Sequence, residues 1–383
     1  MKTITTGRLP IKLWCNNPED GCIKQAMNLA NLPFAFKHIA LMPDCHQGYG
    51  MPIGGVLATK DYIIPNAVGV DIGCGMTAAQ TTLKASQQSK EKLKTIMGKI
   101  RELVPLGFTR NTERCISALM PELNESHPVV EREYENARKQ MGTLGGGNHF
   151  IELQKDKNDN LWVMVHTGSR NLGKKVADHY NTIAKDHLVR SFSKIEPEWD
   201  LAFLQVQSQQ GKYYIREMQY CMDFAERNRS QILQKILSCL TAGNTRKPYE
   251  IAHNYATQEN HYGENVWIHR KGAILARKGH YGIIPGSQGT KSYITRGLGE
   301  PLSFMSCSHG AGRAMGRKEA MRRLNIDEET KMMNDKGIIH DIRSMEDLDE
   351  APSAYKNIDT VMEEQQNLVE IIEELTPIAV IKG

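Results

Sequence analysis

The longest regular pattern of apolar positions in the chain lies between residues 209 and 240. Apolar side chains recur there at three- and four-residue steps, the spacing of one helix face, and they are Ile215, Met218, Met222, Ala225, Ile232, Leu233, Ile236 and Leu240. We therefore predict a long helix whose apolar stripe belongs to the core rather than to a cofactor site. Charged segments with helical spacing predict further helices over 84–103 and 129–141, and another helix is expected to begin near Leu172. Helices are also predicted at about 311–323 and 354–375, the second from a stripe that runs from Ile358 to Leu375 at helical spacing.

Short β-type runs, separated by glycine and proline, alternate with these helices. They occur over 36–79, at about 150–154 and 161–166, over 266–308, and in the closing segment PIAVIKG. No internal repeat, low-complexity tract or linker interrupts this alternation. We therefore predict an α+β fold, with 1–383 as a single mixed domain in which residues 1–35 are the least defined part.

The charge of the chain permits nucleic-acid binding without requiring it. The 383 residues carry a net charge of +4, and the sequence pI is about 8.5. The excess is local, because five basic residues lie between 313 and 323 against the single acid Glu319. A solvated helix face is the commoner explanation for such a run.

The cysteine pattern and the N-terminus predict a soluble, cytoplasmic protein with no membrane association. The eight cysteines include no CxxC pair, and a chain of this size does not need disulfides. The first residues, MKTITTGRLPIKLW, contain no apolar signal core, and no apolar run approaches 18 residues.

A candidate metal centre is the most informative feature of the sequence. The run DIGCG places Asp71 three residues before Cys74, with glycines beside the thiol, and a thiolate can bridge two cations. Four histidines lie in glycine- or asparagine-bearing contexts elsewhere: His149, His166, His253 and His309. One such position alone is more often ordinary core, because free cysteines pack as small hydrophobes and most histidines bind no metal. Their joint occurrence indicates a dispersed metal centre.

Several glycine-rich segments predict phosphate binding beside that centre. The segment GTLGGGNHFIE offers backbone N–H groups, HTGSRNLG offers Ser169 and Arg170, and PGSQGTKSYI offers Ser287 and Ser292. No G-K-[ST] follows the glycines and no GxGxxG follows a strand, so neither a Walker loop nor a Rossmann site is indicated.

The segment SCSHGAGR is the sharpest of these motifs. A predicted strand ends at His309, and we expect Arg313 at the start of a helix, where it would favour an anion beside the imidazole. His309 could be a ligand, an acid/base or a covalent nucleophile, and spacing alone does not choose among them. The earlier segment MPDCHQGYGMPIGG holds Asp44 and His46 and is equally compatible with a glycine-rich hairpin.

These blocks, in this order, resemble the RtcB-type RNA ligases from about Ala40 to Gly383. The resemblance includes MPDCHQGYGMPIGG, GVDIGCGM, GTLGGGNHFIE, VHTGSRNLG, IAHN, HRKGA, PGSQGTKSYI, SHGAGR, DEAPSAYK and a terminal KG. The chain is short for the family and resembles a compact bacterial branch. It departs at Gln288, where the family usually has Met in PGSMG, and at Gly316, where MSR is usual after HGAGR.

The resemblance implies a GTP- and manganese-dependent ligase that joins RNA 3′-phosphate or 2′,3′-cyclic phosphate ends to 5′-hydroxyl ends. It implies that two manganese ions are held by Asp71, Cys74, His149, His166 and His253, with Cys74 as the bridge. It also implies that His309 attacks the α-phosphorus of GTP and carries GMP.

The resemblance assigns further residues to the nucleotide and the RNA. Contacts to phosphates or ribose would come from Asn148, Ser287, Ser292 and Arg313. The guanine would be surrounded by Phe150, Glu152, Tyr355 and Lys382. Asp44 and Arg170 match family positions near the RNA ends and the second reaction step.

Two other functions compete with RNA ligation. A dinuclear metallophosphoesterase acting on cyclic phosphate ends would need the metal cluster but no guanine pocket. A non-catalytic RNA- or ribosome-binding protein would hold a structural metal, yet such sites are usually closed and four-coordinate, and the chain has a surplus of candidate ligands.

Overall fold

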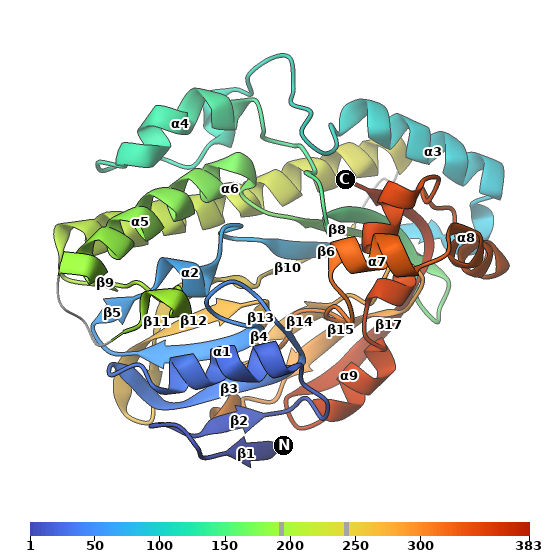
Figure 1. Cartoon of the computed structure of the whole chain (residues 1–383). Coiled ribbons are helices and arrows are strands. Elements are labelled where there is room, and N and C mark those ends of the chain that lie inside the picture. Colours follow the sequence, from blue (N-terminus) through green and yellow to red (C-terminus); the bar gives the residue numbers. More distant parts are fainter. Residues whose placement is uncertain (191–194, 241–244) are drawn as a thin grey trace.

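A computed structural model describes residues 1–190, 195–240 and 245–383 of the chain. Strands and helices alternate along it, which confirms the predicted α+β fold (Figure 1). The helices are α1 Asp20–Ala30, α2 Pro65–Val68, α3 Lys90–Leu103, α4 Pro128–Arg138, α5 Arg170–Arg190, α6 Gln209–Leu240, α7 Arg317–Arg323, α8 Ile326–Asp335 and α9 Ile358–Glu364.

Two larger sheets organise the described chain. The strand order of the first, with six strands, is β1-β2-β3-β4-β12-β11, and all its pairs are antiparallel except β2 with β3. Its strands are β1 Lys2–Ile4, β2 Ile11–Leu13, β3 Ala35–His46, β4 Ile53–Thr59, β12 Glu264–Lys271 and β11 Asn254–His261.

The second sheet is antiparallel throughout and has the order β10-β6-β8-β7-β17-β15-β14. Its strands are β10 Tyr249–Ala252, β6 Gly75–Lys84, β8 Asn160–Thr167, β7 Phe150–Lys155, β17 Val369–Lys382, β15 Ser292–Gly297 and β14 Tyr281–Ile284. Two short pairs join β13 Ala273–Leu275 to β16 Ser306–Ser308, and β5 Tyr62–Ile63 to β9 Leu204–Gln205.

The long helix α6 has the predicted bounds and lies with α3 against the seven-stranded sheet, and α4 and α5 pack against α6 (Figure 1). Its apolar stripe is core, as predicted, because Ile232, Leu233 and Ile236 pack with the sheet residues Val163 and Val165. The predicted strands at 150–154 and 161–166 are confirmed as β7 and β8, and the helix expected near Leu172 is α5.

Several predicted boundaries are wrong. The helix expected over 84–103 begins only at Lys90, because β6 continues to Lys84. The run NAVGVDIG, expected as a strand, contains the short helix α2 and a loop. Only 317–323 of the helix expected over 311–323 is helical, so Arg313 lies in the preceding loop. The helix expected over 354–375 ends at Glu364, and its second half is the start of β17.

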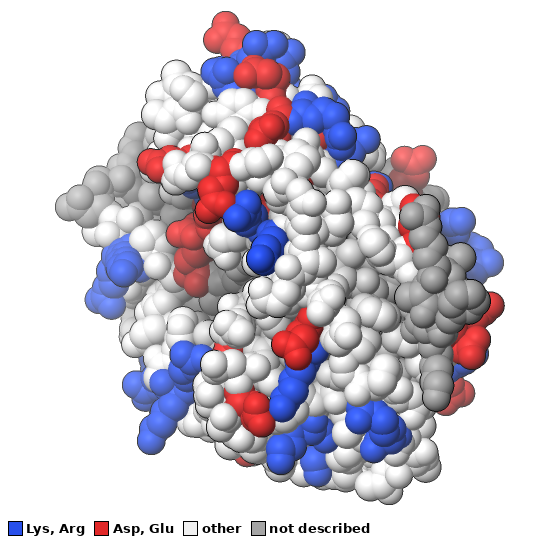
Figure 2. Space-filling view, turned by 90° about the vertical axis from the view of Figure 1, so that its left-hand side faces the viewer, with Lys and Arg blue, Asp and Glu red and all other residues white. Residues whose placement is uncertain are grey.

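Surface charge, helix composition and the cysteines add three observations. On the face drawn in Figure 2, the visible Lys and Arg side chains stand in separate groups, and much of the centre is uncharged. Among the described helices, none is long and apolar enough to cross a membrane. All eight cysteines are free, as the sequence predicts.

Candidate active site

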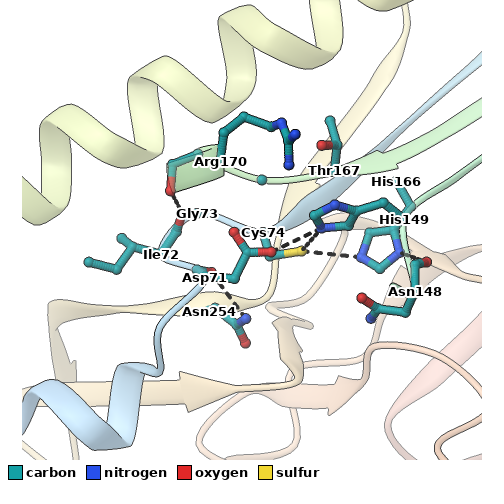
Figure 3. A network of polar contacts seen from close by, with 12 residues as sticks. Asp71, Ile72, Gly73, Cys74, Asn148, His149, His166, Thr167, Arg170 and Asn254 are labelled. Carbon is teal, nitrogen blue, oxygen red and sulfur yellow. Dashed lines mark hydrogen bonds and ion pairs between the residues drawn. The ribbon is translucent and has the colours of Figure 1, made fainter. Parts of the chain in front are cut away.

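The predicted metal ligands converge at one place from four separate segments. Asp71 and Cys74 lie in the turn between α2 and β6, His149 directly precedes β7, His166 lies in β8, and His253 joins β10 to β11. Figure 3 shows Asp71, Cys74, His149 and His166 directed toward one another at the ends of these strands. Two backbone hydrogen bonds join the DIGCG segment to residues 253–254. The N–H of Gly73 donates to the carbonyl of Asn254, and the N–H of His253 donates to the carbonyl of Cys74.

The ligand atoms form two overlapping groups that share the thiol of Cys74. One group is Cys74, His166 and His253, the other is Asp71, Cys74 and His149, and within each group the atoms lie within 4.8 Å of one another. The Cys74 Sγ atom is 3.3 Å from His166 Nε2 and 3.5 Å from His149 Nε2. The His149 Nε2 atom is 3.0 Å from Asp71 Oδ2. This is the arrangement that two cations bridged by one thiolate would need.

The protonation chemistry of the cluster suits metal binding. Burial, together with neighbouring histidines, lowers the pKa of His166 and of His253 well below the usual value, so both imidazoles are neutral and can ligate. Burial and the charge of Asp71 raise the pKa of the Cys74 thiol. A bound cation would lower that pKa and displace the thiol proton. The chemistry of the donors therefore fits a metal that accepts oxygen, nitrogen and sulfur.

Residues outside the ligand set hold the cluster in place. The Nδ1 atom of His166 lies 3.1 Å from the carbonyl oxygen of Asn148, which leaves Nε2 free for a cation. The buried guanidinium of Arg229, from α6, donates to the carbonyls of Gly73 and Thr167 at 2.9 and 2.8 Å. Nothing in the sequence motifs marks Arg229, because its role depends on a contact across 156 residues of chain.

His309 lies beside this cluster, directly after β16. Its ring centroid is 4.8 Å from that of His253. Its Nδ1 atom is 2.6 Å from Asp44 Oδ2, and its backbone N–H donates to the same oxygen at 3.0 Å. Because a carboxylate accepts, the imidazole proton lies on Nδ1 and the free lone pair of the ring is on Nε2.

An irregularity in β3 places Asp44 behind His309. The register against β4 shifts between Leu41 and His46, so the strand bulges where Asp44 lies. Gly312 lies against this bulge with a φ of +72°, and a Cβ there would come within 2.2 Å of the Asp44 carbonyl oxygen. The glycine of the HGAGR segment is therefore required by the close approach of the two loops.

A cavity of about 1050 Å³ opens beside the metal cluster and His309. Twelve of the predicted site residues line it: Asp71, Cys74, Asn148, Phe150, Glu152, His166, His253, Ser287, His309, Arg313, Tyr355 and Lys382. The volume is large enough for a nucleotide. The other four predicted residues, Asp44, His149, Arg170 and Ser292, lie behind this lining.

Ser292 and Arg170, two of the four residues behind the lining, are held by hydrogen bonds. Ser292 accepts from Gln154 Nε2 at 3.0 Å, and the same amide donates to Glu152 at 2.6 Å. Arg170 has a φ of +60° and donates to Thr143 and to the carbonyl of Gly107. A Cβ on Gly145 would come within 2.1 Å of Arg170 and 2.5 Å of His149, so this glycine of the GGG run is needed for close packing.

One end of the cavity has groups that suit a purine base. The Lys382 ammonium lies 5.6 Å from the centroid of the Phe150 ring, and the Arg313 guanidinium lies 5.2 Å from that of Tyr355. Burial raises the pKa of Glu152 to about 8. Arg313 therefore lies against the wall of the cavity formed by the rings of Phe150 and Tyr355. It does not lie at the helix N-terminus that the sequence predicted.

Glu350, which no sequence motif singled out, joins Arg313, Tyr355 and Lys382 at this end of the cavity. Its carboxylate is 2.8 Å from Arg317 Nε, 3.2 Å from Arg313 Nη1 and 4.0 Å from Lys382 Nζ, and it accepts a hydrogen bond from the Tyr355 hydroxyl. The signal was present, since Glu350 is the second residue of DEAPSAYK.

The fold and the site define a class of protein, namely a metal-binding enzyme with a nucleotide-sized cavity. A family model described as "tRNA-splicing ligase RtcB" matches residues 25–126 and 109–383. The RNA-splicing ligase RtcB of Escherichia coli K12 is 38% identical over 410 aligned residues, which cover 99% of this chain and 99% of that protein. The chain belongs to the RtcB family of RNA ligases, which confirms the resemblance found in the sequence.

More distant relatives match over nearly the same length. The tRNA-splicing ligase RtcB of Thermococcus kodakarensis is 30% identical, with 95% of this chain and 92% of that protein covered. The RNA-splicing ligase RtcB of Mycobacterium tuberculosis is 29% identical, with 94% and 100% covered. The similarity therefore extends over the parts of the chain that build the site.

Proposed function

We propose that this chain is a GTP- and manganese-dependent RNA ligase. It joins an RNA 3′-phosphate or 2′,3′-cyclic phosphate end to a 5′-hydroxyl end. The observation that carries the proposal is the position of His309, whose Nδ1 is held by Asp44 beside a two-part metal cluster and a nucleotide-sized cavity. A cyclic-phosphate hydrolase would need the cluster but has no use for the purine end of the cavity.

In the first step, we propose that His309 Nε2 attacks the α-phosphorus of GTP. A P–N bond forms, the bond to the β-phosphate oxygen breaks, and pyrophosphate leaves. Asp44 stabilises the positive charge that develops on the imidazole, because its carboxylate already accepts the Nδ1 proton. When bound, the two cations would supply charge stabilisation at the phosphates.

In the later steps, we propose that water first opens a 2′,3′-cyclic phosphate end to a 3′-phosphate with a free 2′-hydroxyl, and that GMP then passes from His309 to the RNA 3′-phosphate. The RNA 5′-hydroxyl then attacks that phosphate and GMP leaves. None of the RNA steps needs another covalent group from the protein, so positioning and charge supply the catalysis.

For the metals, we propose that Asp71, Cys74, His149, His166 and His253 would hold two ions, with Cys74 as the residue common to both ligand groups. For the nucleotide, Glu152, Lys382, Phe150 and Tyr355 hold the guanine, and Asn148, Ser287 and Arg313 contact phosphate or ribose. The mixed donor set accommodates manganese, but zinc binds such donors more tightly by affinity order, so metal availability contributes to selection.

A product assay tests the proposal and separates it from simple hydrolysis. RNA fragments with a 2′,3′-cyclic phosphate and a 5′-hydroxyl should be joined only when GTP and manganese are both present, and not when ATP replaces GTP. Opening of the cyclic phosphate without any joined product, with GTP present, would instead identify a metallophosphoesterase.

A further inference from the structure

Two apolar side chains are exposed at the edge of the cavity, and the proposed chemistry uses neither of them. Tyr49 is 82% exposed and Val70 is 50% exposed, and both contribute to the lining. Val70 directly precedes the proposed metal ligand Asp71. Single exposed apolar residues are ordinary on a protein surface, but exposed apolar residues grouped at a binding cavity indicate an interaction site. We call Tyr49 and Val70 the cavity rim.

One lysine side chain brings the two residues of the cavity rim together. The Nζ atom of Lys271 donates to the carbonyl of Tyr49 at 2.6 Å and to that of Asn66 at 2.9 Å. A Cβ on Gly69, the neighbour of Val70, would lie 3.3 Å from Lys271 Cε. The loop that carries Tyr49 and the loop that carries Val70 therefore meet at the same side chain and form one edge of the cavity.

The backbone around Tyr49 is fixed, although its ring is exposed. The carbonyl of Gly48 accepts from Gln25 Nε2 at 2.6 Å, and the N–H of Gly48 donates to Gln25 Oε1 at 3.0 Å. Gly50 has a φ of +67°, and a Cβ there would come within 2.6 Å of the carbonyl oxygen of Asp200. Among the described residues, the Tyr49 side chain has no hydrogen bond and no aromatic neighbour. The loop therefore holds an exposed ring in a preorganised position.

The charges beside the cavity rim favour a flat, uncharged group over a phosphate. Glu19 and Asp200 line the cavity with carboxylates, and the ammonium of Lys271 donates to two backbone carbonyls. Carboxylates repel a phosphate, whereas a nucleobase presents an uncharged face that stacks on an aromatic ring. The RNA ends of the proposed reaction must reach His309 through this cavity. An unpaired base of an RNA end is therefore the group that fits the cavity rim.

We propose that the ring of Tyr49 stacks on the terminal nucleobase of an RNA end, with Val70 packed beside that base. The inference rests on the proposed function and deepens it, because it names a residue that positions the RNA. Such a stack accepts any of the four bases, since every base has a π-face. The base comes from the strand that ends in a 3′-phosphate or from the strand that ends in a 5′-hydroxyl.

Binding of single RNA strands tests this contact and identifies the strand. Dissociation constants are measured by fluorescence anisotropy, with manganese and without GTP, for a 3′-phosphate strand and a 5′-hydroxyl strand. Each strand is prepared with its terminal base and with an abasic terminal nucleotide. Tyr49→Ala should weaken binding of at least one intact strand roughly five- to 100-fold, the worth of one base–aromatic stack. For the same strand without its terminal base, Tyr49→Ala and wild type should bind equally well.

Two control variants separate stacking from other effects. Tyr49→Phe keeps the ring and should bind all strands as wild type does. Tyr281→Ala, at an exposed tyrosine outside the cavity lining, should do the same. Unchanged binding of both intact strands by Tyr49→Ala would overturn the proposal in favour of a protein partner at the cavity rim. A loss that is the same with and without the terminal base would overturn it in favour of a structural role.

Failure of this inference is distinguishable from failure of the proposed function. The wild-type enzyme is tested in parallel for joining of RNA ends with GTP and manganese. Joined RNA together with unchanged strand binding in Tyr49→Ala would overturn the Tyr49 contact alone. If the wild-type enzyme neither bound the strands nor joined them, the proposed function would fail, and the Tyr49 contact with it.

Discussion

At the scale of single residues, the proposed chemistry depends on the position of the proton on the His309 ring. Asp44 is fully buried and accepts from both Nδ1 and the backbone N–H of His309, so it fixes the ring's tautomer and orientation. The resemblance had placed Asp44 near the RNA ends. Its position behind the imidazole gives it a more direct role, since it can stabilise the charged ring during attack on GTP.

Asp44→Asn should slow GMP transfer to His309 by roughly 100- to 10,000-fold, because the amide can donate to Nδ1 and favour the wrong tautomer. The rate is measured in a single turnover with labelled GTP and manganese. Metal content should be unchanged, since Asp44 is in neither ligand group. Transfer at the wild-type rate would rule out that Asp44 fixes the tautomer of the His309 ring.

Cys74→Ala should disrupt both cation sites, because each ligand group includes this thiol. We expect manganese affinity to fall by at least about 100-fold and GMP transfer to be lost. Metal content and transfer are measured together. Cys115→Ala, at a half-buried cysteine outside both groups, is the matched control. Two tightly held ions and full transfer in Cys74→Ala would contradict the bridging role.

Glu152 should make the stability of the ligand-free protein depend on pH. Burial raises its pKa to about 8, so the folded protein retains a proton that the unfolded chain releases near the ordinary glutamate value. Its contribution is complete below about pH 4.5 and is lost as the pH rises toward 8, at no more than roughly 1.4 kcal/mol per pH unit. Glu152→Gln removes this dependence.

The measurement is urea unfolding of wild type and Glu152→Gln at pH 5.5 and 7.5. The free energy of unfolding of the variant, relative to wild type, should increase between the two pH values. A difference that does not change with pH would show that Glu152 is ionised throughout this range.

At the scale of elements, the last strand shows where local patterns are misleading. Apolar residues from Ile358 to Gln365 follow a helical stripe, and α9 forms there as expected. Beyond Leu368 the same spacing predicts helix, but the chain forms β17, which pairs with β15 along its first part and with β7 along its second. The partners of β17 are distant in sequence, so their hydrogen bonds could not be anticipated from the segment itself.

The end of β17 supports the site in two separable ways. Lys382 pairs with Phe150 in the sheet, and the N–H of Gly383 donates to the carbonyl of the proposed metal ligand His149 at 3.2 Å. Lys382→Ala should weaken GTP binding roughly ten- to 100-fold with normal manganese binding, since a hydrogen bond to a charged group is lost.

Deletion of Lys382 and Gly383 should weaken manganese binding as well, because the bond to His149 is also removed. Nucleotide and metal affinities are measured for both variants, with unfolding curves as the control for folding. Equal manganese affinity in the two variants would show that Gly383 does not support His149. Unchanged GTP binding in both variants would show that Lys382 and Gly383 do not contribute to nucleotide binding.

At the scale of the whole molecule, the sequence predicted the composition of the site better than its geometry. Twelve of the predicted residues line one cavity. They could be predicted because their motifs combine unusual residues with glycines needed for close approach. The supporting residues Arg229, Gln154 and Glu350 were missed, because their roles arise from contacts between distant segments. Element types were mostly correct and boundaries less so, since β-sheet pairing overrides local propensity. The extent of a single ligase domain over 1–383 stays a prediction.

The central claim is that His309 carries GMP as a covalent intermediate. The most direct measurement is incubation of the full chain with labelled GTP and manganese, followed by mapping of the modified residue by mass spectrometry. We predict an adduct on His309 that is acid-labile and relatively stable to alkali, with no adduct in His309→Ala. An adduct that persists in His309→Ala, or no adduct in a wild-type protein that binds both GTP and manganese, would contradict this account.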